Sequence, residues 1–249
     1  NPGDVRLIQE MLRGTGDPRF QLDVADSLAQ AKKKLGRSSF DLALVDLGLP
    51  DSNGMETFVS LHRQWPRLPM IILTGLNDEA LAIESVKKGA QDYLVKGELD
   101  ARLLVRSIRY AIERNRSEIA LEENRQFLEN VLNAIQDGIS VLDTDLNIVH
   151  VNPWMEKMYP EHLPLAGKKC FTIYQKREST CPFCPSIRAI QTGQSMTEVV
   201  PYPNEDAPAG WILLSAFPLF DDVGHVTGVI ESVRDITEKR TAEARLIES

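Results

Sequence analysis

Long apolar runs, cysteine and positive charge are all scarce in this sequence, and each absence excludes a class of protein. No apolar run approaches the roughly 18 residues of a membrane span, and no basic-then-apolar secretory leader opens the chain. The three cysteines are an odd number and do not resemble a disulfide framework. The net charge of −8 argues against a general nucleic-acid binder, because binding to phosphates requires a basic surface. We therefore expect a cytoplasmic protein that binds neither a membrane nor nucleic acid.

What the sequence does contain is enough for two ordinary domains. The chain has 249 residues, of which 43% are apolar and 26% are charged, as in folded soluble proteins. Its first half alternates short apolar runs with helical segments, which is typical of parallel βαβ units. The runs expected to be strands are residues 20–24, 42–45, 69–75 and 93–96.

The apolar run in residues 40–50, FDLALVDLGLP, leads to Asp46 at the end of an expected strand. The turn-forming residues after it favour a strand over a piece of buried helix. Thr74 and Lys96 end the next two strands, and open α/β folds carry their chemistry at the carboxyl ends of parallel strands. A carboxylate beside a cation and a hydroxyl can accept a phosphoryl group, since the carboxylate attacks and the other two bind oxygens. Each of these three residues alone has an ordinary structural explanation. Their joint placement at neighbouring strand ends favours a functional site.

The motifs around these three residues are LVDLGLPDSNG, IILTG and GAQDYLVKG. Through them, residues 1–115 resemble the receiver domain of two-component response regulators. The resemblance implies a doubly wound, flavodoxin-like α/β domain in which a histidine kinase phosphorylates Asp46. It also implies that Thr74 follows the phosphoryl group, that Lys96 binds the acylphosphate, and that Tyr93 is the aromatic switch that turns inward.

One departure from the receiver family concerns its magnesium ion. The resemblance implies that Asp46 and the backbone carbonyl of Gly48 bind Mg²⁺, together with an acidic pair that ends the family's first strand. That strand and that pair would precede residues 1–4, and the sequence does not contain them. A hard divalent cation needs several oxygen ligands, so Asp46 and one carbonyl make an incomplete site. We therefore expect a truncated receiver domain that is phosphorylated inefficiently.

Residues 99–135 contain no convincing helix breaker, which predicts one long helix that leaves the first domain. Leu121, Leu128 and Ile135 are spaced by seven, which is a short heptad pattern. The pattern is compatible with a dimerising coiled coil and with an ordinary helix that turns one stripe toward a core. We favour a connector that forms a homodimer, because both of its ends adjoin domains.

After residue 137 the apolar period changes to two, and the pattern predicts an α+β domain with one antiparallel sheet. The hairpin DGISVLDTDLNIVHVNP and the final segment VRDITEKR resemble a PAS sensor domain. In that family, Asp235 and Thr237 tie the last strand to the outgoing helix, and Thr237 is equally suited to cap that helix. The resemblance implies an input, such as a small-molecule ligand, whose identity the sequence does not indicate.

Cys170, Cys181 and Cys184 are the local feature of the second domain that most suggests chemistry. The two-residue gap in Cys181-Pro-Phe-Cys184 allows both thiolates to bind one metal ion or to react with each other. A structural Zn²⁺ needs four ligands, and His162 is a better candidate for the fourth than His150. A Zn²⁺ site, a redox dithiol and inert thiols all stay open.

The predicted organisation is a receiver domain at residues 1–112, a helical connector at 113–135, a PAS domain at 136–240 and the start of an outgoing signalling helix at 241–249. The sequence shows no kinase, nucleotide-binding or cyclase motif, so we expect a signalling protein and not an enzyme. The leading hypothesis is two-component signal transduction, in which Asp46 and the PAS domain control an output domain through the connecting helices. The rival hypothesis is a redox or metal sensor with the cysteine loop as its input and a degenerate receiver as an interaction module.

Overall fold

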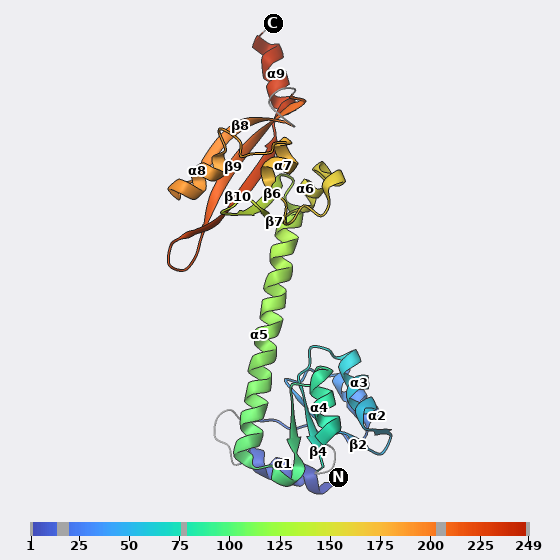
Figure 1. The fold of residues 1–249 in the computed structure, drawn as a ribbon. Coiled ribbons are helices and arrows are strands. Elements are labelled where there is room, and N and C mark those ends of the chain that lie inside the picture. Colours follow the sequence, from blue (N-terminus) through green and yellow to red (C-terminus); the bar gives the residue numbers. More distant parts are fainter. Residues whose placement is uncertain (1, 14–19, 76–78, 203–207, 248–249) are drawn as a thin grey trace. The chain divides into compact units, whose positions relative to one another are not determined.

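The chain forms two compact units, Asn1–Asn124 and Arg125–Ser249. Each unit has its own sheet and its own hydrophobic core (Figure 1). The computed structural model describes residues 2–13, 20–75, 79–202 and 208–247.

The first unit is built on a parallel sheet in the order β1-β4-β5. Its strands are β1 (Ala43–Asp46), β4 (Met70–Thr74) and β5 (Asp92–Val95). The central strand β4 is buried along its whole length, which explains its unbroken apolar sequence. A short hairpin of β2 (Gly48–Leu49) and β3 (Ser52–Asn53) follows β1.

Helices cover both faces of this sheet, as expected for a doubly wound fold. Alternate residues of β4 point to opposite faces, so Ile71 belongs to one core cluster and Ile72 to another. The Ile71 cluster includes Ile8 and Leu104, and the Ile72 cluster includes Phe58. The helices are α1 (Pro2–Arg13), α2 (Leu28–Leu35), α3 (Met55–Gln64), α4 (Glu79–Lys87) and the first turns of α5 (Ala101–Ala134). The short helix η1 (Lys96–Glu98) leads into α5.

The prediction of a strand at residues 20–24 is wrong. This segment has no strand pairing in the structure, although Phe20 packs against the core. In the flavodoxin-like strand order 2-1-3-4-5, the second strand pairs only with the first. Among the described residues of the first unit, the parallel sheet consists of β1, β4 and β5, so no such first strand lies beside this segment for it to pair with.

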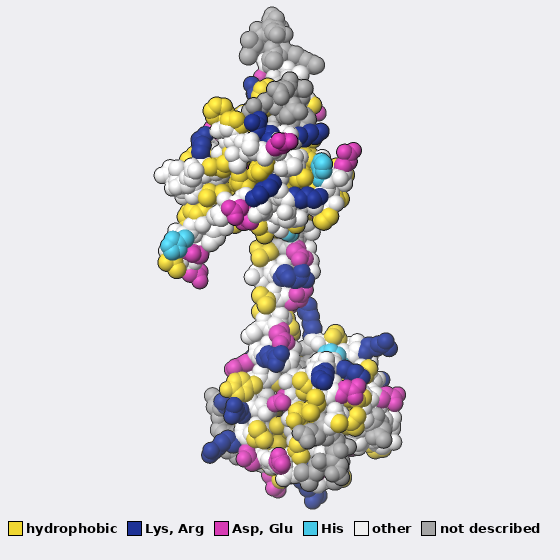
Figure 2. Space-filling view, viewed as in Figure 1, with side chains coloured by type: hydrophobic (Ala, Val, Ile, Leu, Met, Phe, Trp, Pro, Cys, Tyr) yellow, Lys and Arg dark blue, Asp and Glu magenta, His cyan; other side chains and the backbone are white. Residues whose placement is uncertain are grey.

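Helix α5 runs for 34 residues, which confirms the predicted long helix. Its first turns bury Leu104 and Ile108 against the sheet. Farther along, the large apolar side chains of Leu121 and Leu128 are 71% and 53% exposed, and Figure 2 shows apolar side chains on this helix among charged ones. Ile135, the third residue of the predicted heptad, follows the end of α5. None of the helices in the described ranges is long and apolar enough to cross a membrane.

The second unit contains an antiparallel sheet in the order β7-β6-β10-β9-β8, which confirms the predicted α+β fold. Its strands are β6 (Gly138–Asp143), β7 (Ile148–Val151), β8 (Met196–Tyr202), β9 (Gly210–Phe220) and β10 (Val226–Asp235). Strand β6 pairs with β7, β8 with β9 and β9 with β10, and β10 also pairs with β6, so that β7 and β8 form the two edges. Strand β10 is therefore central and is paired along both edges.

Short helices between β7 and β8 pack on this sheet in one core cluster. They are α6 (Pro153–Met158), η2 (Pro160–His162), α7 (Cys170–Gln175) and α8 (Pro185–Thr192). The buried Asn152 fixes the start of α6, because its side-chain oxygen accepts hydrogen bonds from the N–H groups of Ile139 and Met155. Gly193 ends α8 with a φ of 66°, as a C′ glycine does. The last element is α9 (Thr237–Ile247).

Candidate functional sites

The carboxyl ends of the three parallel strands carry the three predicted site residues. Asp46 ends β1, Thr74 ends β4 and Lys96 directly follows β5. The ammonium nitrogen of Lys96 (Nζ) donates to Asp46 Oδ2 over 2.6 Å. Lys96 and Asp46 stand fifty positions apart in the sequence, and their side chains are about a quarter exposed. The fold thus brings a cation into direct contact with the candidate nucleophile.

A second carboxylate contacts the same lysine, and the sequence did not predict it. Asp4, in the first turn of α1, lies 2.9 Å from Lys96 Nζ. Burial alone would lower the pKa of Lys96, but hydrogen bonds to Asp46 and Asp4 outweigh burial and raise the pKa above its usual value. Lys96 is therefore a permanent positive charge held between two acids.

Thr74 is 2% exposed, and its Oγ1 has no hydrogen-bond partner among the described residues. Buried hydroxyl groups are nearly always paired, because leaving one unpaired costs about 1–3 kcal/mol. A hydrogen-bonding group brought to this edge of the sheet would give Thr74 its partner. Tyr93, in β5, is partly buried and packs against the core cluster that contains Phe58.

The loop after Asp46 is fixed by two sets of hydrogen bonds. The Gly48 N–H donates to Asp46 Oδ1 over 3.0 Å. The Asp51 carboxylate accepts from the N–H groups of Leu28 and Ala29, at the start of α2, over 2.8 and 2.9 Å. The bonds from Ala29 and Leu28 hold the pKa of Asp51 below its usual value. The segment that carries Gly48 is therefore anchored to the N-terminus of α2.

The predicted Mg²⁺ ligands, Asp46 and Gly48, fit the ion only in part. Mg²⁺ prefers about six oxygen ligands, commonly one or two carboxylates together with water and phosphate. Asp46 and Asp4 are two carboxylates that converge, but both already contact Lys96. The described residues contain no group of three or more side chains placed to hold a metal ion. These two acids would need further oxygen ligands to bind Mg²⁺.

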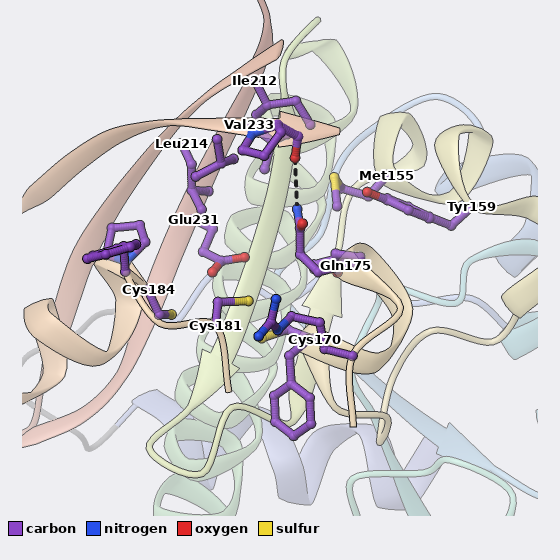
Figure 3. Close-up of a pocket in the computed structure, with 17 residues that line it drawn as sticks. Met155, Tyr159, Cys170, Gln175, Cys181, Cys184, Ile212, Leu214, Glu231 and Val233 are labelled. Carbon is purple, nitrogen blue, oxygen red and sulfur yellow. Dashed lines mark hydrogen bonds between the residues drawn. The ribbon is translucent and has the colours of Figure 1, made fainter. Parts of the chain in front are cut away.

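The second candidate site is a cavity of about 80 Å³ between the sheet and the short helices of the second unit (Figure 3). Most of its wall is apolar or aromatic, with side chains from α6, α7, β9 and β10. These are Met155, Tyr159, Tyr174, Ile212, Leu214 and Val233. Charged or amide side chains are few on this wall, and they are Gln175, Arg177 and Glu231.

Glu231, in the middle of β10, is 3% exposed and points into this cavity (Figure 3). The hydroxyl of Ser186, in the first turn of α8, donates to Glu231 Oε1. Burial raises the pKa of Glu231 to about 7, and the hydrogen bond from Ser186 opposes that shift. The sequence pattern could have identified this residue. Glu231 lies two residues from Val229 and from Val233, so all three side chains lie on the same face of the strand, toward the core.

All three cysteines line the cavity, but His162 does not. The predicted four-ligand Zn²⁺ site is not assembled: His162 lies on η2, and no such group of ligands occurs in the part of the chain that the structure describes. Burial raises the pKa of the Cys170 and Cys184 thiols, which disfavours the thiolate that binds metals or attacks disulfides. Cys181 and Cys184 share a turn in which the Cys184 N–H donates to the Cys181 carbonyl. A redox role for this pair stays a prediction.

Strand β10 leads directly into α9, and Thr237 fixes the junction. The Trp211 N–H donates to Thr237 Oγ1 over 2.9 Å, and the Thr237 N–H donates to Asp235 Oδ1 over 2.8 Å. Gly210 makes room for this arrangement, since a Cβ there would lie 2.3 Å from Thr237 Oγ1. The first residue of α9 is thus tied to the start of β9.

Both units therefore have the architecture of signalling domains. The first holds an acid–lysine pair at the carboxyl edge of a doubly wound sheet, and the second encloses a small cavity against an antiparallel sheet. Comparison with family models agrees: residues 1–109 match the response regulator receiver domain and residues 132–241 match the PAS fold. The chain contains a response regulator receiver domain followed by a PAS domain.

Similar curated proteins align with part of the chain. KDP operon transcriptional regulatory protein KdpE of Escherichia coli is 38% identical over 104 residues, which are 40% of this chain and 44% of KdpE. Transcriptional regulatory protein ZraR of Klebsiella oxytoca is 33% identical over 90 residues, which are 36% of this chain and 20% of ZraR. The chain thus spans less than half the length of either regulator. A solved receiver domain protein (CheY-like) of Methanospirillum hungatei is 24% identical, with a TM-score of 0.42, and the match covers 47% of this chain and 91% of that one.

Proposed function

We propose that Asp46 accepts a phosphoryl group from a histidine kinase and that the PAS domain supplies a second input to the same signalling protein. The observation that most supports phosphorylation is the contact between Lys96 Nζ and Asp46 Oδ2. A carboxylate alone repels an anionic phosphoryl group. An ammonium group held beside it offsets this repulsion and stabilises the charge that develops during transfer.

In the proposed transfer, a carboxylate oxygen of Asp46 attacks the phosphorus of a phosphohistidine. The new O–P bond forms while the P–N bond breaks, and the donor ring, protonated on its other nitrogen, leaves as neutral imidazole with the P–N electron pair on the released nitrogen. The product is an acylphosphate on Asp46. Lys96 then exchanges its hydrogen bond to Asp46 Oδ2 for a charge-assisted hydrogen bond to a phosphoryl oxygen, while Asp4 continues to hold the ammonium group.

Thr74 and Tyr93 give this product a structural consequence. The unpartnered Thr74 hydroxyl ends the strand next to Asp46, so it is placed to donate to a phosphoryl oxygen. A movement of Thr74 toward the phosphoryl group would leave space that the partly buried Tyr93 ring fills. Phosphorylation at Asp46 would in this way alter the surface formed by β5 and α4.

The test is to incubate the chain with phosphoramidate and Mg²⁺ and to locate the added phosphoryl group by mass spectrometry. We expect substoichiometric labelling, confined to Asp46 and abolished by Asp46→Asn. The matched control is Asp41→Asn, because Asp41 precedes the same strand but forms an exposed pair with Arg116. Labelling that survives Asp46→Asn, or the absence of any label, contradicts the proposal.

The connecting helix gives the two domains a route to a shared output. We assign residues 1–112 to the receiver, 113–135 to the connector, 136–240 to the PAS domain and 241–249 to an outgoing helix. The exposed Leu121 side chain and its heptad partner on the connector support association with a second copy of the chain. In such a dimer, both domains bias the packing of the same helices, which is the shared two-state element that coupling requires.

The hydrogen bonds at Thr237 support a relay from the PAS sheet to α9 and then to an output domain. The rival hypothesis, a metal or redox sensor with a degenerate receiver, is less favoured. Its proposed ligands do not converge in the described structure, and two of its three thiols are buried and protonated. The receiver, in contrast, retains its Asp46–Lys96 contact.

A further inference from the structure

The wall of the PAS cavity carries one carboxyl group, that of Glu231, and among the described residues this group forms no ion pair, although Arg177 lines the same cavity. Glu231 is almost fully buried, and its Oε1 accepts one hydrogen bond, from the neutral Ser186 hydroxyl. Ser186 is the one side-chain partner of Glu231 among the described residues, and its hydrogen bond leaves Oε2 of Glu231 without a partner there. An unpaired buried charge is costly, so this group holds a proton unless a cation comes within hydrogen-bond distance of it.

The surroundings of Glu231 favour an organic cation over a metal ion. The neighbouring thiols of Cys170 and Cys184 are protonated, and no three-ligand group forms around them in the described residues. The aromatic rings of Tyr159 and Tyr174 line the same cavity with their centroids 4.9 Å apart. Aromatic ring faces attract cations, and apolar walls favour a ligand with a hydrocarbon body.

The size of the cavity limits the ligand. One water occupies roughly 10–15 Å³ by this measure, so the available volume of about 80 Å³ holds about six water-sized groups. Phe183 lines the cavity and is 75% exposed, which shows that the wall reaches the molecular surface there. A small molecule therefore has both room inside and a short path to enter.

We propose that the PAS cavity binds a small primary amine as its ammonium cation, with Glu231 as the anion that anchors it. The ammonium group donates a hydrogen bond to Glu231 Oε2, while Ser186 continues to hold Oε1. The hydrocarbon body packs against Met155, Leu214 and Val233. This inference names the ligand class for the sensor role proposed above and rests on that role.

The first test is isothermal titration calorimetry of the whole chain at pH 8 with matched series of ligands. Each series has one carbon skeleton and three head groups: 3-methylbutylamine, 3-methylbutanol and 3-methylbutanoate form one, and 2-methylpropylamine, 2-methylpropanol and 2-methylpropanoate form another. We expect saturable binding of an amine, at least tenfold tighter than its alcohol or carboxylate. Equal binding of the three head groups, or binding of none of the amines, overturns the proposal.

The second test uses Glu231→Gln, which keeps the shape of the side chain and its contact with Ser186 but removes the charge. We expect this variant to lose at least tenfold in amine affinity and to keep its affinity for the alcohol. Glu198→Gln, an exposed acid on β8 paired with Arg188, is the matched control and should bind the amine as the wild type does. An unchanged amine affinity in a folded Glu231→Gln variant contradicts the proposal.

A wild-type measurement keeps the proposal testable if Glu231→Gln does not fold. Amines of this kind are protonated below about pH 9, so they would enter the cavity as ammonium cations. The proposed ion pair then forms only when Glu231 is ionised. Amine affinity should therefore rise about tenfold from pH 6 to pH 8, since Glu231 titrates near pH 7. The other titratable side chains facing it, Tyr159, Cys170, Tyr174 and Cys184, stay neutral in this range because burial raises their pKa values. Arg177 and Cys181 also line the wall, and Arg177 keeps its charge throughout.

An affinity that falls as pH rises would identify a ligand that accepts a hydrogen bond from protonated Glu231 and would overturn the amine assignment. None of these readouts involves Asp46. Failure of phosphorylation together with amine binding removes the receiver proposal alone, and phosphorylation without amine binding removes the ligand assignment alone.

Discussion

Replacement of Glu231 by Gln should change how the stability of the PAS domain depends on pH. The pKa of Glu231 is raised by burial from 4.5 to about 7 in the folded protein. Between these values the folded protein holds a proton that the unfolded chain has released. The free energy of unfolding therefore falls as pH rises through this window and is constant above it. At about 1.4 kcal/mol per pKa unit, the total loss is about 3 kcal/mol, most of it between pH 5 and pH 8.

The assay is urea unfolding of wild type and Glu231→Gln at half-unit steps from pH 5 to pH 8. All proteins in the assay carry Trp65→Phe, which removes the tryptophan of the first unit, so the fluorescence of Trp154 and Trp211 follows the unfolding of the second unit. We expect the variant to match the wild type at pH 5 and to be more stable by about 2–3 kcal/mol at pH 8, because Gln resembles the protonated acid and never ionises. The contributions of all other titrating groups to the pH dependence are the same in both proteins, so they cancel in the difference between the two free energies of unfolding.

Glu198→Gln is the matched control, because Glu198 belongs to an exposed ion pair of the same sheet and such pairs contribute little. Its stability should run parallel to that of the wild type across the whole range. Parallel curves for Glu231→Gln as well would refute the reasoning, since they would mean that the Glu231 carboxyl ionises as easily inside the protein as in water.

Three further predictions test other parts of the structure by substitution. Gly210→Ala should destabilise the PAS domain by about 1–3 kcal/mol in urea unfolding, because the added methyl group would clash with Thr237 Oγ1. In a protein that already carries Thr237→Ala, the same substitution should cost about 1 kcal/mol less. Thr74→Val should leave receiver stability unchanged or raise it by about 1 kcal/mol, because it removes an unpaired buried hydroxyl, yet it should slow the gain of phosphoryl label. The pair Leu121→Ser and Leu128→Ser should weaken self-association at least about 100-fold in sedimentation equilibrium, since the proposed dimer would lose these two exposed leucines from each of its two helices.

Each of these three predictions has an outcome that would contradict it. If the losses of stability from Gly210→Ala and Thr237→Ala were additive, the methyl group added at residue 210 would not contact Thr237 Oγ1. A large loss of stability in Thr74→Val would mean that its hydroxyl is hydrogen-bonded. Gln126→Ser, on the same exposed helix, should leave self-association unchanged, and an equal loss there would remove the heptad stripe as the cause.

Local sequence patterns predicted the strand ends of the receiver because each strand is a short apolar run followed by a polar residue. Asp46, Thr74 and Lys96 could be placed at one edge from the parallel arrangement alone. The contact of Asp4 with Lys96 could not, since it depends on where α1 starts relative to the sheet. Residues 20–24 show the opposite error, because an apolar pattern does not reveal whether a neighbouring strand exists to pair with.

In the PAS domain, the turn residues around Asp143 and the period-two alternation predicted the hairpin and the sheet. The three cysteines line the PAS cavity, but the Zn²⁺ site predicted from their spacing is not assembled among the described residues. Spacing along the chain shows that two thiols can approach each other, and it gives no information on burial, which here keeps Cys170 and Cys184 protonated. No role for Glu231 was predicted from the sequence, although its position two residues after Val229 places both side chains on the same face of the strand.

The central position of β10 limits how the PAS sheet can move. Glu231 is paired with Ser140 on one side and Ala216 on the other, and the pairing with β9 continues to Asp235. A slide of one residue would break both ladders and turn Glu231 to the opposite face. About four residues, or roughly 13 Å, separate Glu231 from Asp235. A change in the cavity can therefore reach α9 only as a rotation of the strand about its own axis or a tilt of its end, and the outgoing helix would turn instead of advancing along the chain direction.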